Sequence, residues 1–146
     1  FSPHALTDEE VESEIESFVN AAALAQYGGF DGVEIMGSEG YLINQFLTQR
    51  ANVRDDRWGG SYENRMRFPV EVIRRVRERC GPNFIIVYRL SMLDLVPDGS
   101  TWEEVVLLAK AIEKAGATII NTGMKREFRR LPPRFRERHL LGFQRK

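Results

Sequence analysis

The sequence predicts an α/β fold in which parallel strands are joined by helices. Segments with apolar residues at helical spacing alternate along the chain with short segments that are apolar at nearly every position. The order is helix, strand, helix, strand, helix, strand. Strands of this continuously apolar kind are typical of parallel sheets with helical crossovers, because both of their faces are buried.

The first helix is predicted over residues 8–26. Thr7 and Glu10 have the spacing of a capping box, and acidic residues fill the first turn, where the helix dipole favours them. Apolar residues then recur every three or four positions. Two glycines within residues 27–30 end the helix, and the apolar segment 32–36 is predicted to be the first strand.

The next two units follow the same plan. A helix begins at Ser61, and Pro69 inside its pattern either kinks this helix or marks a second start. The apolar segment 84–90 is predicted to be the second strand. A second capping box at Thr101 begins the third helix, and the segment 117–122 is predicted to be the third strand.

Two architectures accommodate this order, an eight-stranded βα barrel and an open doubly wound sheet. No Gly-x-Gly-x-x-Gly motif follows a strand into a helix, which excludes the dinucleotide-binding fingerprint. Polar residues cluster after strand ends, as on the catalytic face of a barrel. They are Ser38, Tyr41, Arg89, Ser91 and Asn121. Because a complete barrel takes about 250 residues, we interpret the chain as a partial TIM (β/α)8 barrel with three βα units.

The composition is that of an ordinary soluble globular protein, with 42% hydrophobic and 29% charged residues. No apolar segment approaches the roughly 20 residues that a membrane-spanning helix needs, and the first residues lack a signal-peptide pattern. We therefore expect a cytoplasmic protein with no membrane partner. Cys80 is the only cysteine, so we expect no disulfide and no metal site.

The net charge of zero conceals two unlike parts. Residues 1–123 hold 12 Lys and Arg against 19 Asp and Glu, a net charge of −7, whereas residues 124–146 hold 9 against 2, a net charge of +7. We therefore divide the chain into a partial barrel over residues 1–123 and a basic tail over residues 124–146. Phenylalanines alternate with the basic residues of the tail, a composition compatible with binding to nucleic acid or another anionic surface.

The segment 32–50 carries the candidate site. After the strand and two glycines, Tyr41 offers a phenolic hydroxyl and Arg50 a permanent positive charge. A strand end that presents a proton donor and a guanidinium is where an α/β enzyme places its chemistry. On residue type alone, Tyr41 is also compatible with a helix-start aromatic and Arg50 with a solvated surface charge. Arg89 is a third candidate, because a charge within an apolar strand is costly to bury unless it is paired.

Three motifs carry a resemblance to a known family. They are Gly29-Phe30-Asp31-Gly32-Val33-Glu34-Ile35, then Gly40-Tyr41-Leu42-Ile43-Asn44-Gln45-Phe46-Leu47, and Asn52-x-Arg54-x-Asp56-x-Trp58-Gly59-Gly60 with Glu63-Asn64-Arg65. Over residues 1–123 the sequence resembles the old yellow enzyme family of flavin oxidoreductases. Most of that family has histidines where this chain has Met36 and Glu39, and here the chain is similar to the bacterial 2,4-dienoyl-CoA reductases. We expect the polar residues of the third motif to be structural.

The resemblance implies a barrel that holds FMN at its C-terminal mouth and passes a hydride from NADPH to an activated C=C bond. The substrate would be a 2,4-dienoyl-CoA of fatty acid β-oxidation, or an enoate. In this interpretation Tyr41 is the catalytic proton donor, Arg50 binds the acyl-CoA substrate, and Arg89 is the cofactor-binding residue beside the flavin. A phenol with a pKa of about 10 stays protonated at neutral pH. A guanidinium is a natural partner for an anionic isoalloxazine ring. FAD and an iron–sulfur cluster would belong to further C-terminal parts of such reductases.

The tail departs from the family pattern. After Thr122-Gly123 the family continues within a few residues into His-Glu-Ala-Arg-Ile-Pro, whose histidine is the partner of the tyrosine. This chain has Met124-Lys125-Arg126 instead, and no histidine stands in that place. Ordinary codons for residues 123–134, read from the last base of the glycine codon, encode His-Glu-Ala-Arg-Ile-Pro-Thr-Ile-Ala-Thr-Ser. We therefore expect residues 124–146 to be an out-of-frame, disordered product.

Three functions remain open. The first is a fragment of an FMN-dependent enoyl-CoA or dienoyl-CoA reductase, and the second is a binding arm for nucleic acid, a partner that we do not favour. The third is a remnant without activity, which would self-associate or aggregate through the open edges of a partial barrel. We expect enzymatic ancestry and an inactive isolated chain, because the flavin phosphate site of such barrels is built from the last strands.

Overall fold

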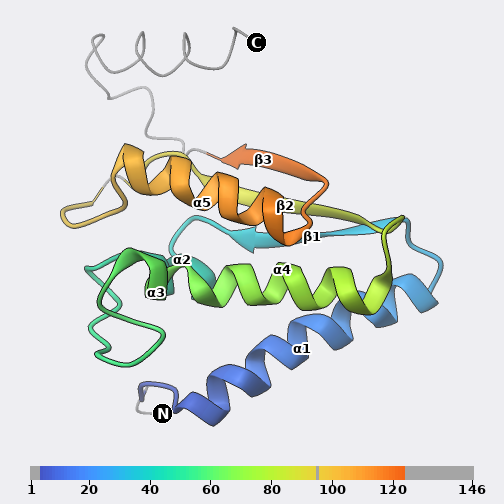
Figure 1. Cartoon of the computed structure of the whole chain (residues 1–146), viewed down its shortest axis with the longest axis horizontal. Coiled ribbons are helices and arrows are strands. Elements are labelled where there is room, and N and C mark those ends of the chain that lie inside the picture. Colours follow the sequence, from blue (N-terminus) through green and yellow to red (C-terminus); the bar gives the residue numbers. More distant parts are fainter. Residues whose placement is uncertain (1–3, 95, 124–146) are drawn as a thin grey trace, which may run out of the picture.

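The computed structural model describes residues 4–94 and 96–123, which form one sheet with helices packed against it (Figure 1). In chain order the elements are α1 (Asp8–Tyr27), β1 (Gly32–Gly37), α2 (Leu42–Leu47), α3 (Tyr62–Arg65), α4 (Arg67–Cys80), β2 (Ile85–Ser91), α5 (Trp102–Ala115) and β3 (Ile119–Gly123). The predicted alternation of helices and strands is confirmed. The short helix α2, which follows the loop after β1, is an addition to the predicted order.

The three strands form a parallel sheet in the order β1-β2-β3. Met36 of β1 lies opposite Arg89 of β2, and Arg89 lies opposite Asn121 of β3. Consecutive strands as neighbours are the arrangement of a barrel segment, and one half of a doubly wound sheet has the same order. The sheet thus agrees with the predicted partial barrel, and β1 and β3 are its edges within the described residues.

Both predicted capping boxes are present at helix starts. The Glu10 N–H donates to Thr7 Oγ1 at 3.2 Å, and the Thr7 N–H donates to the Glu10 carboxylate at 2.7 Å. Thr101 and Glu104 repeat this exchange at the start of α5, at 3.2 and 2.9 Å. Each box satisfies two N–H groups that have no partner within the helix, so local sequence fixes where α1 and α5 begin.

Pro69 follows a second helix start. The helix predicted from Ser61 is divided, because α3 ends at Arg65 and α4 begins at Arg67. Pro69 lies in the first turn of α4, where a backbone N–H has no intrahelical acceptor to lose. Of the two alternatives that the sequence left open, the second start is therefore correct.

The third strand begins at Ile119, two residues later than predicted. The Ala117 N–H donates to the carbonyl oxygen of Ile112 in α5 at 3.1 Å. The Thr118 hydroxyl accepts a hydrogen bond from Arg77 Nη2 at 2.9 Å. These contacts assign the two residues to the end of α5 and to the junction with α4 rather than to β3.

The helices cover one face of the sheet and leave the other open. Figure 1 shows α1 and α4 running alongside each other on the covered side. The strand residues buried against the helices include Ile35, Ile86, Tyr88 and Leu90. On the opposite face Met36, Ile85 and Ile119 are 38%, 40% and 51% exposed. We call this second side the open face; it also carries Glu34, Arg89 and Asn121.

Three further sequence expectations concern membranes, metals and the tail. No helix in the described ranges is long and apolar enough to cross a bilayer. No group of three or more His, Cys, Asp or Glu side chains that could hold a metal ion occurs within residues 4–94 and 96–123. The predicted basic tail, residues 124–146, lies outside the described residues.

Candidate functional site

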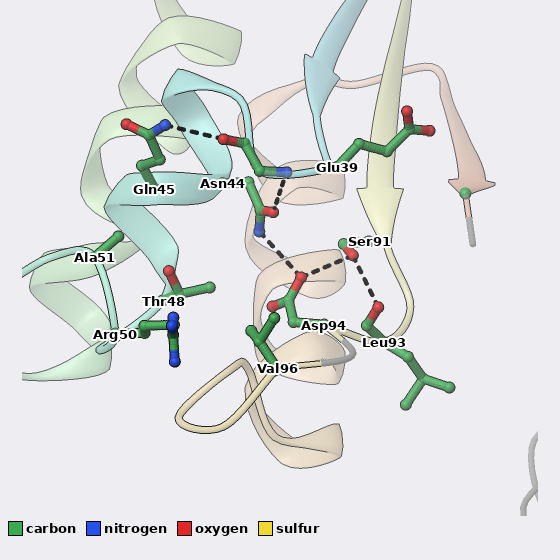
Figure 2. Close-up of a pocket in the computed structure, with 12 residues that line it drawn as sticks. Glu39, Asn44, Gln45, Thr48, Arg50, Ala51, Ser91, Leu93, Asp94 and Val96 are labelled. Carbon is green, nitrogen blue, oxygen red and sulfur yellow. Dashed lines mark hydrogen bonds between the residues drawn. The ribbon is translucent and has the colours of Figure 1, made fainter. Parts of the chain in front are cut away.

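A cavity of about 280 Å³ lies at the carboxyl ends of β1 and β2. Its lining residues are Glu39, Gly40, Asn44, Gln45, Thr48, Arg50, Ala51, Ser91, Leu93, Asp94, Val96 and Gly123. They come from the loop after β1, from α2 and the turn after it, from the end of β2 and the loop that follows, and from the last residue of β3 (Figure 2). This is the end of a parallel sheet at which α/β proteins bind their ligands.

Arg89 lies on the open face of β2 between two carboxylates. Its Nη2 donates to Glu39 Oε1 at 3.2 Å, and its Nη1 lies 4.0 Å from Glu34 Oε1. Asn121 of β3 donates to the same Glu34 oxygen at 2.7 Å. The Nε of Arg89 is buried and has no hydrogen-bond partner within the described part of the chain. One hydrogen bond to Glu39 therefore holds the guanidinium, while its buried Nε donor remains unused.

Gly123 places Arg89 directly beside the cavity. A Cβ atom on Gly123 would lie 3.1 Å from Arg89 Nε, tighter than an ordinary contact, so a larger residue would crowd the guanidinium. Gly123 itself lines the cavity, whereas Arg89 does not. The predicted cofactor-binding residue thus stands behind one wall of the cavity.

The loop after β1 contains two consecutive residues in the left-handed region. Glu39 has φ of 67° and Gly40 has φ of 84°. This conformation is unfavourable for a glutamate and persists only where neighbouring contacts hold it. The Gly40 N–H donates to Asn44 Oδ1 at 2.7 Å, and Gln45 Nε2 donates to the Gly40 carbonyl at 2.9 Å. The loop therefore aims the Glu39 carboxylate at Arg89.

Asp94 joins the loop after β2 to two other segments. Its Oδ1 accepts hydrogen bonds from Ser91 Oγ at 3.0 Å and from Asn44 Nδ2 at 3.3 Å, both drawn in Figure 2. Its Oδ2 accepts from the Ser100 N–H at 3.0 Å. The donors belong to the end of β2, to α2 and to the segment before α5. One carboxylate therefore connects two parts of the cavity wall with the segment before α5.

Arg50 provides the positive charge of the cavity lining. The residue is exposed, and its backbone N–H donates to the Asp98 carbonyl at 3.3 Å, which ties it to the loop after β2. Within residues 4–94 and 96–123 its guanidinium has no ion pair or hydrogen bond. The predicted substrate-binding arginine is thus at the cavity and is accessible to an anionic group.

Tyr41 is the N-cap residue of α2, and it is 60% exposed. Its backbone carbonyl accepts from the Gln45 N–H at 3.0 Å, and its side chain makes no capping hydrogen bond. Tyr41 is not among the lining residues of the cavity. The structure therefore places Arg50 in the cavity lining, Arg89 behind the Gly123 wall, and Tyr41 in the adjoining loop, where it is exposed to solvent.

Residues of the third motif, which spans residues 52–65, hold the segments around the cavity in place, as expected of structural residues. Arg65 is only 3% exposed, donates to the Leu47 carbonyl at the end of α2, and pairs with Glu104 of α5 at 2.6 Å. Arg54 and Asp56 form an ion pair at 2.5 Å within the preceding loop. Arg65 therefore fixes α2, which carries part of the cavity wall, against α5.

Sequence reasoning did not single out Glu39, Asn44 or Asp94 as site residues. Glu39 had a usable signal, since it precedes a glycine in a turn that directly follows a strand. Asn44 and Asp94 are 50 positions apart, and no spacing rule joins them. Only the parallel pairing of β1 with β2 brings their segments together.

Comparison with known proteins gives a family match over most of the chain. The NADH:flavin oxidoreductase / NADH oxidase family matches residues 1–141. An NADH oxidase of Thermoanaerobacter brockii is 45% identical over 119 residues, which are 82% of this chain and 18% of that protein.

Solved structures of related enzymes share the fold. A 2-naphthoyl-CoA reductase in complex with 2-naphthoyl-CoA superposes with a TM-score of 0.77 at 38% identity, over 84% of this chain and 19% of that one. An old yellow enzyme homologue from Zymomonas mobilis superposes with a TM-score of 0.74 at 31% identity, over 82% of this chain and 34% of that one. The chain thus spans well under half the length of the proteins that it matches.

Proposed function

Because the chain belongs to the NADH:flavin oxidoreductase / NADH oxidase family, we propose that it forms part of the catalytic barrel of an FMN-dependent oxidoreductase. The reaction is reduction of an activated C=C bond with a hydride that originates from NADPH. The observation that carries this proposal is a cavity on the carboxyl ends of parallel strands that Arg50 lines and that Arg89 adjoins through Gly123.

The residues around Arg89 fit a flavin. The buried Nε of Arg89 has no hydrogen-bond partner among the described residues, so it is available to an acceptor atom of a planar anionic ring. FMN, when bound, accepts a hydride from NADPH and delivers it to the substrate. Arg89 would hold the ring and favour the negative charge that the ring carries when reduced. Gly123 leaves the space that this contact needs.

We propose an acyl-CoA ester as the substrate, a 2,4-dienoyl-CoA in the first instance and a simple enoate as the alternative. The similarity to a 2-naphthoyl-CoA reductase supports a CoA ester. Arg50, exposed in the cavity lining, would bind an anionic part of the acyl-CoA. Tyr41, whose exposed phenol stands in the adjoining loop, would donate the proton that completes reduction of the C=C bond.

The isolated chain is proposed to be inactive and to self-associate. It corresponds to 18% of the NADH oxidase and 34% of the old yellow enzyme homologue that it matches. The edges of β1 and β3 present unpaired backbone groups within the described residues, and such edges pair readily with other chains. Sedimentation of the purified chain should show species larger than a monomer, and flavin and NADPH together should show no turnover.

The experiment that tests the function places the segment in a complete barrel. Residues 1–123 replace the matching segment of the Thermoanaerobacter brockii NADH oxidase, and the chimera is reconstituted with FMN. We expect NADPH to reduce the flavin and a 2,4-dienoyl-CoA to reoxidise it. Tyr41→Phe should leave flavin reduction unchanged and slow reoxidation by about 100-fold, because only reoxidation needs the proton donor.

The matched control is Tyr27→Phe, which removes the same hydroxyl from a residue that is 92% exposed at the end of α1. It should change neither half-reaction. Reoxidation of the Tyr41→Phe chimera at the unchanged rate would contradict the role of Tyr41. A folded chimera that binds no FMN would contradict the proposed function itself.

A further inference from the structure

Six residues around the cavity form a ring of contacts that begins and ends in β2. They are Arg89, Glu39, Gly40, Asn44, Asp94 and Ser91. Arg89 donates to Glu39, and the next residue, Gly40, donates its N–H to Asn44. Asn44 donates to Asp94, and Ser91 of β2 donates to the same carboxylate oxygen. We call these residues the loop-anchoring ring, and Figure 2 shows its Asn44–Asp94–Ser91 portion.

We propose that Asp94 is a positioning residue, which sets the conformation of the loop after β1 and thereby holds Glu39 against Arg89. Asp94 touches neither Glu39 nor Arg89 through a described hydrogen bond, and it acts through Asn44. This inference rests on the proposed function only where it concerns the flavin, because the contacts themselves belong to this chain.

The argument starts from the two ends of the Asn44 amide. Its Oδ1 accepts from the Gly40 N–H at 2.7 Å, and its Nδ2 donates to Asp94 at 3.3 Å. Asn44 is 4% exposed, so water does not readily replace either contact. An ionised carboxylate only accepts hydrogen bonds, and it therefore favours the amide orientation in which Nδ2 faces Asp94. That orientation leaves the amide oxygen for Gly40.

The Gly40 contact then determines where the Glu39 carboxylate lies. Glu39 and Gly40 both have positive φ, so this stretch of the loop needs an external restraint. With Gly40 held by Asn44, Glu39 reaches Arg89 Nη2 at 3.2 Å. If the restraint is lost, Glu39 can relax out of the left-handed region, and Arg89 then keeps only the more distant Glu34, at 4.0 Å.

Three donors make Asp94 a firm anchor for this ring. Ser91, Asn44 and the Ser100 N–H all point at its carboxylate, and hydrogen bonds to an ionised acceptor are stronger than neutral ones. An asparagine at this position would turn an amide nitrogen toward one of these donors. Asp94→Asn thus tests the anchor with almost no change in volume.

The experiment measures amide hydrogen exchange in the full 146-residue chain by NMR. In Asp94→Asn the Gly40 N–H should exchange about 10-fold faster than in the unmodified chain, because its acceptor is no longer held. The amides of Ile15 and Val76, buried in α1 and α4, should exchange at unchanged rates. A general loss of stability would accelerate all three amides, and that result would overturn the proposal.

Asp98→Asn is the matched control, since it makes the same charge change four positions later, at an exposed residue of the same loop. It should leave Gly40 exchange unchanged. Ser91→Ala is a milder variant, which removes one donor to Asp94 and should accelerate Gly40 exchange by an intermediate factor. If Ser91→Ala and Asp98→Asn give the same Gly40 rate, the ring does not act as proposed.

A combined variant separates action through Asn44 from a direct effect. If Asp94 acts through Asn44, then Asp94→Asn should add nothing to the Gly40 exchange rate once Asn44→Ala is present, whereas independent effects would multiply.

Titration of the chimera with FMN addresses the flavin separately. An unchanged FMN affinity in Asp94→Asn with altered Gly40 exchange keeps the positioning role and removes its link to the flavin. Absence of FMN binding in the unmodified chimera removes the proposed function alone.

Discussion

The ring of Tyr88 occupies the space where a side chain at Gly37 would be. A Cβ atom on Gly37 would lie 2.2 Å from both Cζ and the hydroxyl oxygen of Tyr88. Tyr88 is fully buried on the helix-covered face of β2, and Gly37 is the last residue of β1. Glycine is therefore the residue that fits at the end of β1, because the ring of Tyr88 occupies the space that a side chain would fill.

Gly37→Ala should lower the free energy of unfolding by about 1–3 kcal/mol, because overpacking a rigid core displaces the ring or the strand. Chemical denaturation measures this loss. The control is Gly28→Ala at the end of α1, where a Cβ would make contacts of 3.4 Å, an ordinary distance. That variant should change stability by no more than about 0.5 kcal/mol. Equal effects of the two variants would contradict the close packing of Gly37 on Tyr88.

Tyr88→Phe should leave stability unchanged or raise it by up to about 1 kcal/mol. The Tyr88 hydroxyl is buried and has no hydrogen-bond partner within the described residues. Removing it therefore removes the cost of burying a polar group that no hydrogen bond compensates. Urea denaturation of the two proteins gives the comparison. A clear destabilisation would mean that the hydroxyl has a favourable partner in solution.

The same phenols predict how stability changes at alkaline pH. Burial raises the pKa of Tyr88 above its ordinary value of 10.0, and burial, with Glu104 and Asp94 nearby, raises the pKa of Tyr62 in the same direction. Above pH 10.0 the unfolded chain loses these protons and the folded chain keeps them, so the unfolded state gains stability.

The contribution of these two tyrosines is therefore complete below pH 10.0 and is lost as pH rises from there toward their folded-state pKa values. Each phenol can contribute a slope of up to about 1.4 kcal/mol per pH unit. Denaturation midpoints between pH 9 and pH 11 (roughly one unit on either side of the ordinary phenol pKa) should fall less steeply in Tyr62→Phe/Tyr88→Phe than in the unmodified chain. Parallel curves would count against the raised pKa values.

Local signals in the sequence were sufficient for the order of the strands and the longer helices, although they did not predict the short helix α2. The capping boxes at Thr7 and Thr101 predicted where α1 and α5 begin, because a box involves residues only three positions apart. The apolar segments predicted the parallel strands, and the three motifs identified the old yellow enzyme family, which the family match and the superposed structures confirm.

The parts that the sequence did not predict depend on contacts between distant segments. The start of β3 at Ile119 depends on Arg77, which lies far away in α4. The cavity wall depends on the contact of Asn44 with Asp94, and the tight fit of Tyr88 on Gly37 depends on the register of two strands. Tyr41 was assigned from its motif, and a motif does not say whether a side chain faces a cavity.

The tail predicts a specific nucleotide sequence. If residues 124–146 are out of frame, the DNA that follows the Gly123 codon must encode His-Glu-Ala-Arg-Ile-Pro when it is read from the last base of that codon. Sequencing both strands across codons 118–146 checks this directly. Codons that cannot be read in this way would refute the frameshift, and the basic tail would then stand as a genuine segment to test for salt-sensitive nucleic-acid binding.

Removing one partner of the buried ion pair between Arg65 and Glu104 should cost more stability than breaking an exposed pair, because the remaining charge stays buried without a partner. The side chains of the two residues are 4% and 19% exposed, and Arg65 also donates to the Leu47 carbonyl and to the Gly60 carbonyl. Arg65→Ala leaves a carboxylate and two carbonyl groups without their donor, which should cost about 3–5 kcal/mol.

The control for Arg65 is Arg74→Ala in α4. Arg74 pairs with Glu71 and Glu78 at 2.7 and 2.5 Å, but its side chain is 42% exposed, and exposed pairs contribute less than about 1 kcal/mol. Because Arg65 fixes the end of α2 against α5, its loss should also open the cavity wall, and the Gly40 and Asn44 amides should exchange faster in Arg65→Ala. A loss of stability equal to that of Arg74→Ala would show that α2 is held by the apolar contacts of its own buried residues Ile43, Phe46 and Leu47 alone.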